Sequence, residues 1–264
     1  MIALCHGVEI AYDDVGAGMP VAFVHGFPHN RTLWSPQVNA LVDRARCIAP
    51  DLRGFGESSR HGPFSMDQYA DDVAMLLRSL GVERAVIAGL SMGGYVAFSL
   101  WRRHPSLVRA LVLAHTRAGA DTDEGRAKRT ALAEVARTRG PDAVADAQIT
   151  GMLGKTTREK RPAMIDEVHR MLASASVEGI VGALEAMMAR VDSTATLPTI
   201  DVPTLVIMGD EDALIPRSDG QILHDAIRGS RLEVIEHAGH VSNMERPAAF
   251  NHVLSEFLAS LEYQ

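Results

Sequence analysis

The stretch Gly89-Leu90-Ser91-Met92-Gly93 decides the fold of this chain. It follows the apolar run 85–88 and opens into a segment with a helical pattern over 94–104. A strand that turns sharply into a helix around a serine holds that serine in a strained, exposed position. The residues two places away on each side must be small, because the strand and helix backbones nearly touch there. The two glycines meet this demand, and the serine is the candidate nucleophile.

A serine hydroxyl is a weak nucleophile at neutral pH, so it needs a base, and the base needs an acidic group that orients it. When the nucleophile lies on such a turn, the partners follow in the chain order serine, acid, histidine. The strand pattern 204–208 is followed by Gly209-Asp210-Glu211-Asp212, and the pattern 232–235 by Glu236-His237-Ala238-Gly239-His240. Both loops come directly after strands, where open parallel sheets present their functional residues.

The chain resembles the serine esterases and lactonases of the α/β-hydrolase fold over nearly its full length. Besides the serine turn and the two loops above, the matching motifs are His25-Gly26-Phe27-Pro28, the stretch 51–58 and Glu245-Arg246-Pro247. The resemblance implies that the acid is the last residue of the G-x-x-D pattern, Asp212, and that the base is the histidine after the glycine, His240. Because position 91 is serine, the aspartate nucleophile of relatives that displace halide or open epoxides is absent.

The resemblance also implies an oxyanion hole that is built from two backbone N–H groups. One belongs to Met92, the residue after the nucleophile. The loop 25–28 supplies the other, for which we choose Phe27, since Pro28 has no N–H. Backbone donors cannot be removed by changing a side chain, so substitutions at these two positions would report on the hole only indirectly.

Alternating strand and helix patterns predict an α/β fold with a mostly parallel, twisted sheet that is flanked by helices. Strand-like runs lie near 8–12, 20–25, 46–50, 84–89, 108–114, 203–208 and 231–236. Between 119 and 196 helical patterns replace the strand patterns, with a break at Gly140-Pro141. We therefore predict an α/β-hydrolase core formed by 1–118 and 197–264, with a helical cap, or lid, inserted at 119–196.

The predicted cap contains no Phe, Trp or Tyr, whereas Met and Leu are frequent in it. Methionine adapts to ligands of irregular shape. We expect Met187 and Met188 to line an apolar acyl pocket, which Trp34 would reach from the opposite side. His115, just past the strand 108–114, either lines the pocket and contacts the substrate or is a hydrogen-bonded loop histidine.

Length, composition and charge limit the domain organisation, the partners and the location that the sequence allows. A length of 264 residues and a hydrophobic content of 47% suit one large domain with an insertion. The net charge of −7 argues against nucleic acid and anionic membranes as partners. The first residues lack a signal-peptide pattern and the two cysteines form no disulfide framework, so we expect a cytoplasmic location. We predict no metal and no cofactor, because His237 and His240 lack a third ligand at suitable spacing. The sequence is compatible with a homo-oligomer and does not decide the oligomeric state.

These features predict a serine hydrolase that cleaves small apolar esters or lactones through an acyl-enzyme intermediate. An alternative keeps the site and changes the substrate: a 3-oxoadipate enol-lactonase, or a hydrolase of carbon–carbon bonds in the degradation of aromatic compounds. A lactone that carries carboxylates would need a fixed cation, for which Arg31, Arg117 and Arg190 are candidates. Perhydrolase or haloperoxidase chemistry and a non-catalytic ligand receptor are further alternatives.

Overall fold

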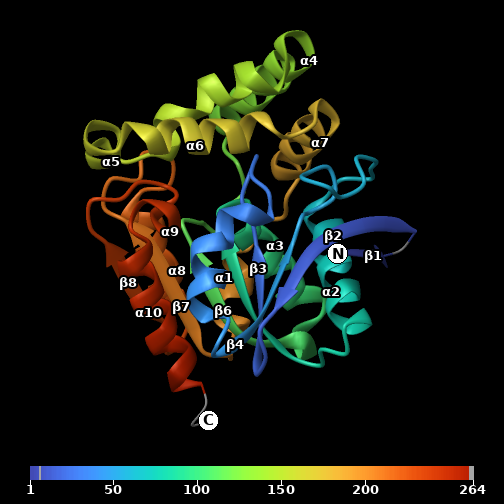
Figure 1. Cartoon of the computed structure of the whole chain (residues 1–264), viewed down its shortest axis with the longest axis vertical. Coiled ribbons are helices and arrows are strands. Elements are labelled where there is room, and N and C mark those ends of the chain that lie inside the picture. The colour runs from blue at the N-terminus through green and yellow to red at the C-terminus, as the bar shows by residue number, and fades with distance from the viewer. Residues whose placement is uncertain (6, 262–264) are drawn as a thin grey trace.

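The computed structural model describes residues 1–5 and 7–261, which contain an eight-stranded sheet (Figure 1). Its strands are β1 (Ile2–Cys5), β2 (Val8–Val15), β3 (Met19–Val24), β4 (Ala45–Pro50), β5 (Ala85–Leu90), β6 (Val108–Ala114), β7 (Thr204–Gly209) and β8 (Arg231–Ile235), in the spatial order β1-β2-β4-β3-β5-β6-β7-β8. β1 pairs antiparallel with β2, and β2 with β4, whereas all pairs from β4 to β8 are parallel. The predicted mostly parallel sheet is confirmed. β1 is an addition that the sequence did not indicate, because it is a four-residue edge strand with a single buried residue.

Helices cover both faces of the sheet (Figure 1). One face carries α2 (Met66–Ser79), α3 (Met92–Arg103) and α8 (Arg217–Ala226), and the other carries α1 (Ser35–Leu41), α9 (Ser242–Glu245) and α10 (Pro247–Ser260). Short 3₁₀ segments, η1 (Arg31–Trp34), η2 (Pro105–Leu107) and η3 (Thr194–Thr199), join some of these elements.

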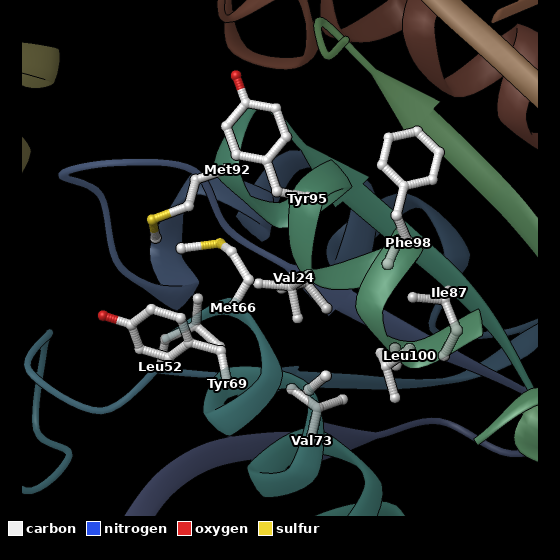
Figure 2. Packing of buried hydrophobic residues seen from close by; sticks show 14 of the residues in the cluster. Val24, Leu52, Met66, Tyr69, Val73, Ile87, Met92, Tyr95, Phe98 and Leu100 are labelled. Atoms are coloured by element: carbon white, nitrogen blue, oxygen red, sulfur yellow. The ribbon is translucent and has the colours of Figure 1, made fainter. Parts of the chain in front are cut away.

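The sheet separates two hydrophobic cores. Along β3, Val21 and Phe23 pack into the core under α1 and α10, whereas Ala22 and Val24 pack into the core under α2 and α3. This alternation is the period of two that a strand imposes on its side chains. Figure 2 shows side chains from α2, α3 and the sheet gathered in the second of these cores. The sheet is therefore closely packed on both faces, and this packing fixes the positions of the loops that follow its strands.

The predicted cap segment 119–196 contains no strand and forms four helices, α4 (Asp123–Met152), α5 (Lys155–Lys160), α6 (Pro162–Ala173) and α7 (Val177–Met188). They lie together at one end of the molecule, above the sheet in Figure 1. α4 is interrupted at Gly140, which has a φ of +81°, directly before Pro141, where the sequence predicts a break. Among the described residues, no single helix is long and apolar enough to span a membrane. The helices α6 and α7 reach the required length and hydropathy only when taken together, and they are bent by 89° relative to each other.

Candidate active site

Ser91 occupies a strained turn between β5 and α3. Its φ is +55° and its ψ is −112°, in a region that residues with a side chain rarely adopt and keep only where the surroundings determine it. Two contacts with the end of β6 fix the turn: the Ser91 N–H donates to the Ala114 carbonyl at 2.8 Å, and the Thr116 hydroxyl donates to the Ser91 carbonyl at 2.8 Å. The backbone of the turn is thus satisfied without the Ser91 hydroxyl, which is left available for chemistry.

The glycines of the turn are required by close approach of the backbone. A methyl group on Gly89 would overlap the carbonyl of Gly93, and a methyl group on Gly93 would overlap the carbonyl of Val24 in β3. The prediction that the residues on both sides of the serine must be small is therefore confirmed.

This contact predicts a large loss of stability for Gly89→Ala. Because the added methyl group meets backbone atoms rather than a flexible side chain, we expect the free energy of unfolding to fall by about 2 kcal/mol or more. The melting temperature should then fall by at least about 4 °C. Gly119→Ala is the matched control, because a methyl group there meets open space. Equal melting temperatures for the two variants would contradict the close approach.

Asp212 and His240 are joined by a hydrogen bond of 2.9 Å between Oδ2 and Nδ1. The Asp212 side chain is fully buried, and that of His240 nearly so. The neighbouring acidic residues bond elsewhere: Asp210 accepts an N–H from the loop 236–240, and Glu211 binds Thr156 of α5. Of the three acidic residues in the first loop, the structure places Asp212 against the histidine.

The surroundings of Asp212 keep it ionised. Burial alone would raise the pKa of the carboxyl, but the interaction with His240 and the hydrogen bonds from His115 and His240 hold the pKa well below its usual range. The other oxygen, Oδ1, accepts the N–H groups of Leu214 and Ile215 at 2.9 and 3.0 Å. Since an ionised carboxylate only accepts hydrogen bonds, Nδ1 of His240 must carry its proton. In the neutral ring Nε2 is then unprotonated, which is the form that a general base requires.

Ser91 and His240 line one cavity of about 400 Å³ between the core and the cap. Phe27 and Met187 also line it. A methyl group on Gly26 would lie 3.3 Å from the Ser91 Cβ, so the loop that contains Phe27 rests against the serine turn. Met92 is buried in the first turn of α3, directly after Ser91. The structure thus brings the serine, the histidine and the expected oxyanion loop to one cavity, with Asp212 behind the histidine.

The expectation that Trp34 contacts the substrate is wrong. Its side chain is fully buried in the core under α1 and α10, where its ring centroid lies 5.1 Å from that of Phe23 and 5.9 Å from that of Phe250. Trp34 ends the short segment η1, and its ring belongs to this core and not to the cavity wall.

Two further residues predicted to contact the substrate lie outside the cavity wall. Met188 follows Met187 in α7, and consecutive residues of a helix point about 100° apart, so Met187 reaches the cavity while the sulfur of Met188 lies 3.5 Å from the hydroxyl of Thr130 on α4. His115 is fully buried, with its Nδ1 2.8 Å from Asp212 Oδ2 and its Nε2 2.7 Å from the Ser242 hydroxyl. Of the two roles considered for His115, the structure shows the hydrogen-bonded one.

The cavity wall is more polar than the apolar wall that we expected. Its charged members are Arg117, Asp121, Glu124, Lys128 and Arg129. Except for Arg117, they belong to the segment 119–196, and no local pattern in the sequence determines how this segment docks on the sheet. Tyr95 also lines the cavity, and this residue could have been found, because it lies four places after Ser91 on α3 and shares its face.

His115, Asp212 and His240 form a cluster whose possible ligand atoms lie within 4.8 Å of one another. Spacing in the sequence did not indicate it, since His115 belongs to a distant loop. Both Nδ1 atoms lie at hydrogen-bonding distances, 2.8 and 2.9 Å, from the same carboxylate oxygen. A ring nitrogen that donates a hydrogen has no lone pair for a metal. The cluster therefore fits a hydrogen-bonded group better than an ion site.

Comparison with known proteins identifies the family. Residues 19–247 match the family described as alpha/beta hydrolase fold. The chain belongs to this family. The structure of a thermophilic esterase from Thermogutta terrifontis, solved with malate bound, is 39% identical in sequence and has a TM-score of 0.94, with 96% of this chain and 94% of the esterase covered.

Two enol-lactonases are also similar to this α/β hydrolase. The structure of the enol-lactonase from Burkholderia xenovorans is 31% identical, with a TM-score of 0.91 and coverage of 98% of this chain and 100% of that enzyme. 3-oxoadipate enol-lactonase 2 from Acinetobacter baylyi is 34% identical over 233 residues, which span 88% of this chain and 85% of that enzyme. The predictions of an α/β-hydrolase fold and of a carboxylic ester hydrolase are confirmed.

Proposed function

We propose that this α/β hydrolase cleaves carboxylic esters with small acyl groups through an acyl-enzyme formed on Ser91. His240 is the general base, and Asp212 orients it. The observation that carries the proposal is that Ser91 and His240 line one cavity while Asp212 binds the Nδ1–H of His240 from behind.

The reaction follows from this arrangement. The Ser91 hydroxyl attacks the ester carbonyl while His240 takes its proton, and the protonated imidazole then gives that proton to the leaving alcohol. The N–H groups of Met92 and Phe27 receive the developing oxyanion, and one such donor contributes about 2.7–4 kcal/mol to lowering the barrier. Water, deprotonated by His240, then hydrolyses the acyl-enzyme and releases the acid.

The proposal is tested with p-nitrophenyl butyrate and a fluorophosphonate, which labels activated serines. We expect hydrolysis of the ester, and we expect one equivalent of the fluorophosphonate to abolish it and to add its mass to the peptide that contains Ser91. A folded protein that hydrolyses no short p-nitrophenyl ester, or that is labelled at another serine, would contradict the proposal.

A second candidate substrate, an ester or lactone with a free carboxylate, is favoured by the charge of the cavity wall. Arg129 and Arg190 both bind Asp121, each at 2.5 Å, so two guanidinium groups face one carboxylate. Arg190 also lies 4.3 Å from the ring centroid of Tyr95, which lines the cavity. This group therefore keeps one excess positive charge beside the substrate space. The similarity to enol-lactonases points the same way.

The other two arginines considered as the fixed cation differ from each other. Arg117 lines the cavity, where its guanidinium donates to the Leu214 carbonyl at 2.8 Å and pairs with Asp219 at 3.2 Å. Arg31, the third candidate, does not line the cavity and pairs with Asp51 and Glu57.

Two esters of equal length test the second candidate: mono-p-nitrophenyl succinate, which carries a carboxylate, and p-nitrophenyl butyrate, which does not. If Arg129 supplies the excess charge, Arg129→Gln should lower the succinate-to-butyrate ratio of kcat/KM by about tenfold, as for loss of a hydrogen bond to a charged group. Arg137→Gln is the control, since Arg137 lies on the same helix outside the cavity wall and pairs with the exposed Glu185 at 2.9 Å. An unchanged ratio for Arg129→Gln would leave the neutral ester as the favoured substrate.

A further inference from the structure

His115 occupies an unusual position directly after β6. Its side chain is fully buried and its φ is +50°, in the left-handed region that residues other than glycine rarely adopt. Such strain persists only where surrounding contacts determine the conformation, and it is frequent at functional sites. The proposed mechanism above gives this residue no role.

The hydrogen bonds of His115 fix its tautomer. Its Nδ1 lies 2.8 Å from an oxygen of Asp212, which as a carboxylate can only accept, so Nδ1 carries the proton. Burial lowers the pKa of His115 more than Asp212 raises it, so the ring is neutral. Nε2 is therefore an acceptor, and the Ser242 hydroxyl donates to it at 2.7 Å. A directed chain thus runs from Ser242 through His115 to Asp212.

The same oxygen of Asp212 serves both histidines. Oδ2 accepts from His115 at 2.8 Å and from His240 at 2.9 Å, while Oδ1 accepts two backbone N–H groups. A carboxylate has about four acceptor positions, and here all four are used. The ring centroids of the two histidines lie 5.5 Å apart at an angle of 65°, so each approaches Oδ2 from its own side.

We propose that His115 is a positioning residue of the Ser91 site, which acts through Asp212. It fixes the orientation of the carboxylate and shares with His240 the hydrogen-bonding capacity of Oδ2. Without the His115 N–H, Oδ2 would accept a hydrogen bond from His240 alone and would stabilise the protonated form of His240 more strongly. Because protonated His240 cannot accept the serine proton, the acid limb of the pH profile would move to higher pH. This role rests on the proposed function.

Other titratable groups face the pair and are unaffected by substitution at 115. His29, on the loop after β3, is buried, and its pKa is lowered to about 3 by burial and by the nearby His25 and His240. Glu245 of α9 accepts the N–H groups of Gly154 and Gly239 beside His240. Since these contacts do not involve position 115, a shift of the acid limb in a His115 variant would report on Asp212 and His240.

Three variants test the role with p-nitrophenyl butyrate as substrate. We expect His115→Ala to lower kcat by about 10–100-fold with little change in KM, the scale of a small misplacement of a catalytic group. The acid limb of kcat/KM should move up by about half a pH unit or more. In His115→Asn the amide nitrogen replaces Nδ1 as donor to Asp212, so most of kcat and the wild-type acid limb should return. Ser242→Ala removes the hydroxyl that donates to Nε2 of His115, so the tautomer of His115 is no longer fixed. This variant should change kcat and the acid limb in the same direction as His115→Ala, but by less.

Two results would overturn the inference: a His115→Ala enzyme with the kcat and acid limb of the wild type, or a His115→Asn enzyme no better than His115→Ala. If His115→Ala does not fold, His115→Asn and Ser242→Ala still decide between positioning and packing.

Proton NMR gives a readout that does not depend on turnover. Imidazole N–H groups bonded to a carboxylate resonate far downfield, so we expect one such signal from His115 and one from His240. The His115 signal should be lost in His115→Ala and His115→Asn. His104 and His169 also contact carboxylates, but at partly exposed sites, so their signals should be distinguishable by faster exchange with water. A wild-type spectrum that lacks the His115 signal or the His240 signal would contradict the shared oxygen. A wild type that shows both signals yet hydrolyses no ester would contradict the proposed function instead.

Discussion

Replacement of Ser91 by alanine is expected to lower kcat for p-nitrophenyl butyrate by about 10⁴-fold or more. The variant loses the nucleophile but keeps the cavity and the two backbone donors, so a small residual rate above that of water remains expected. The fold should persist, because the contacts that hold the turn are made by the Ser91 backbone with Ala114 and Thr116.

Ser99→Ala is the matched control for this prediction. Ser99 lies eight residues further along the same stretch, is fully buried in α3 and bonds Asp67 away from the cavity. The Ser99→Ala variant tests whether removal of a nearby serine hydroxyl is enough to impair activity. We expect its kcat to stay close to that of the wild type. Steady-state kinetics and a melting curve for both variants decide the matter: a Ser91→Ala enzyme with undiminished kcat would exclude an acyl-enzyme at this position.

The serine turn could be predicted because its constraint is local. The strand, the serine between two glycines and the helix occupy the consecutive positions 85–103, and the clash that demands glycine at position 89 arises within this stretch. Asp212 and His240 could be assigned for a related reason. Each follows a strand of the parallel sheet, and the sheet itself brings the carboxyl ends of its strands to one edge.

The side chains whose positions were not predicted correctly are placed by packing between segments that are distant in the sequence. Trp34 is an aromatic residue near the site in sequence, but its direction is set by Phe250 in the last helix. The charged wall around Arg129 depends on how α4 and α7 dock on the core, and Asp121 acquires two arginine partners only after that docking. The contact of His115 with Asp212 could not be predicted, because the two residues are 97 positions apart and only the folded chain brings them together.

Asp212→Asn tests the orienting carboxylate, because the amide cannot satisfy the contacts that the carboxylate makes. Oδ1 accepts two backbone N–H groups, and Oδ2 accepts the N–H groups of His115 and His240. An asparagine has one acceptor oxygen and one donor nitrogen, so its NH₂ group meets two donors whichever way it turns. If it faces the imidazoles, His240 must move its proton to Nε2, and in that tautomer it cannot accept the proton of Ser91.

We therefore expect Asp212→Asn to lower kcat by about 10⁴-fold at neutral pH, the effect of holding a catalytic histidine in the wrong tautomer. Stability should fall as well. The pKa of Asp212 is held below its usual range in the folded protein, so its contribution is complete at neutral pH and declines as the pH falls below the unfolded value of about 3.9. The melting temperatures of wild type and variant should accordingly differ most near pH 7, and this difference should begin to shrink only below about pH 4. Asp210→Asn, two residues away and bonded only to the loop backbone, is the control. A loss of kcat in Asp210→Asn with full activity in Asp212→Asn would move the orienting role to the neighbour.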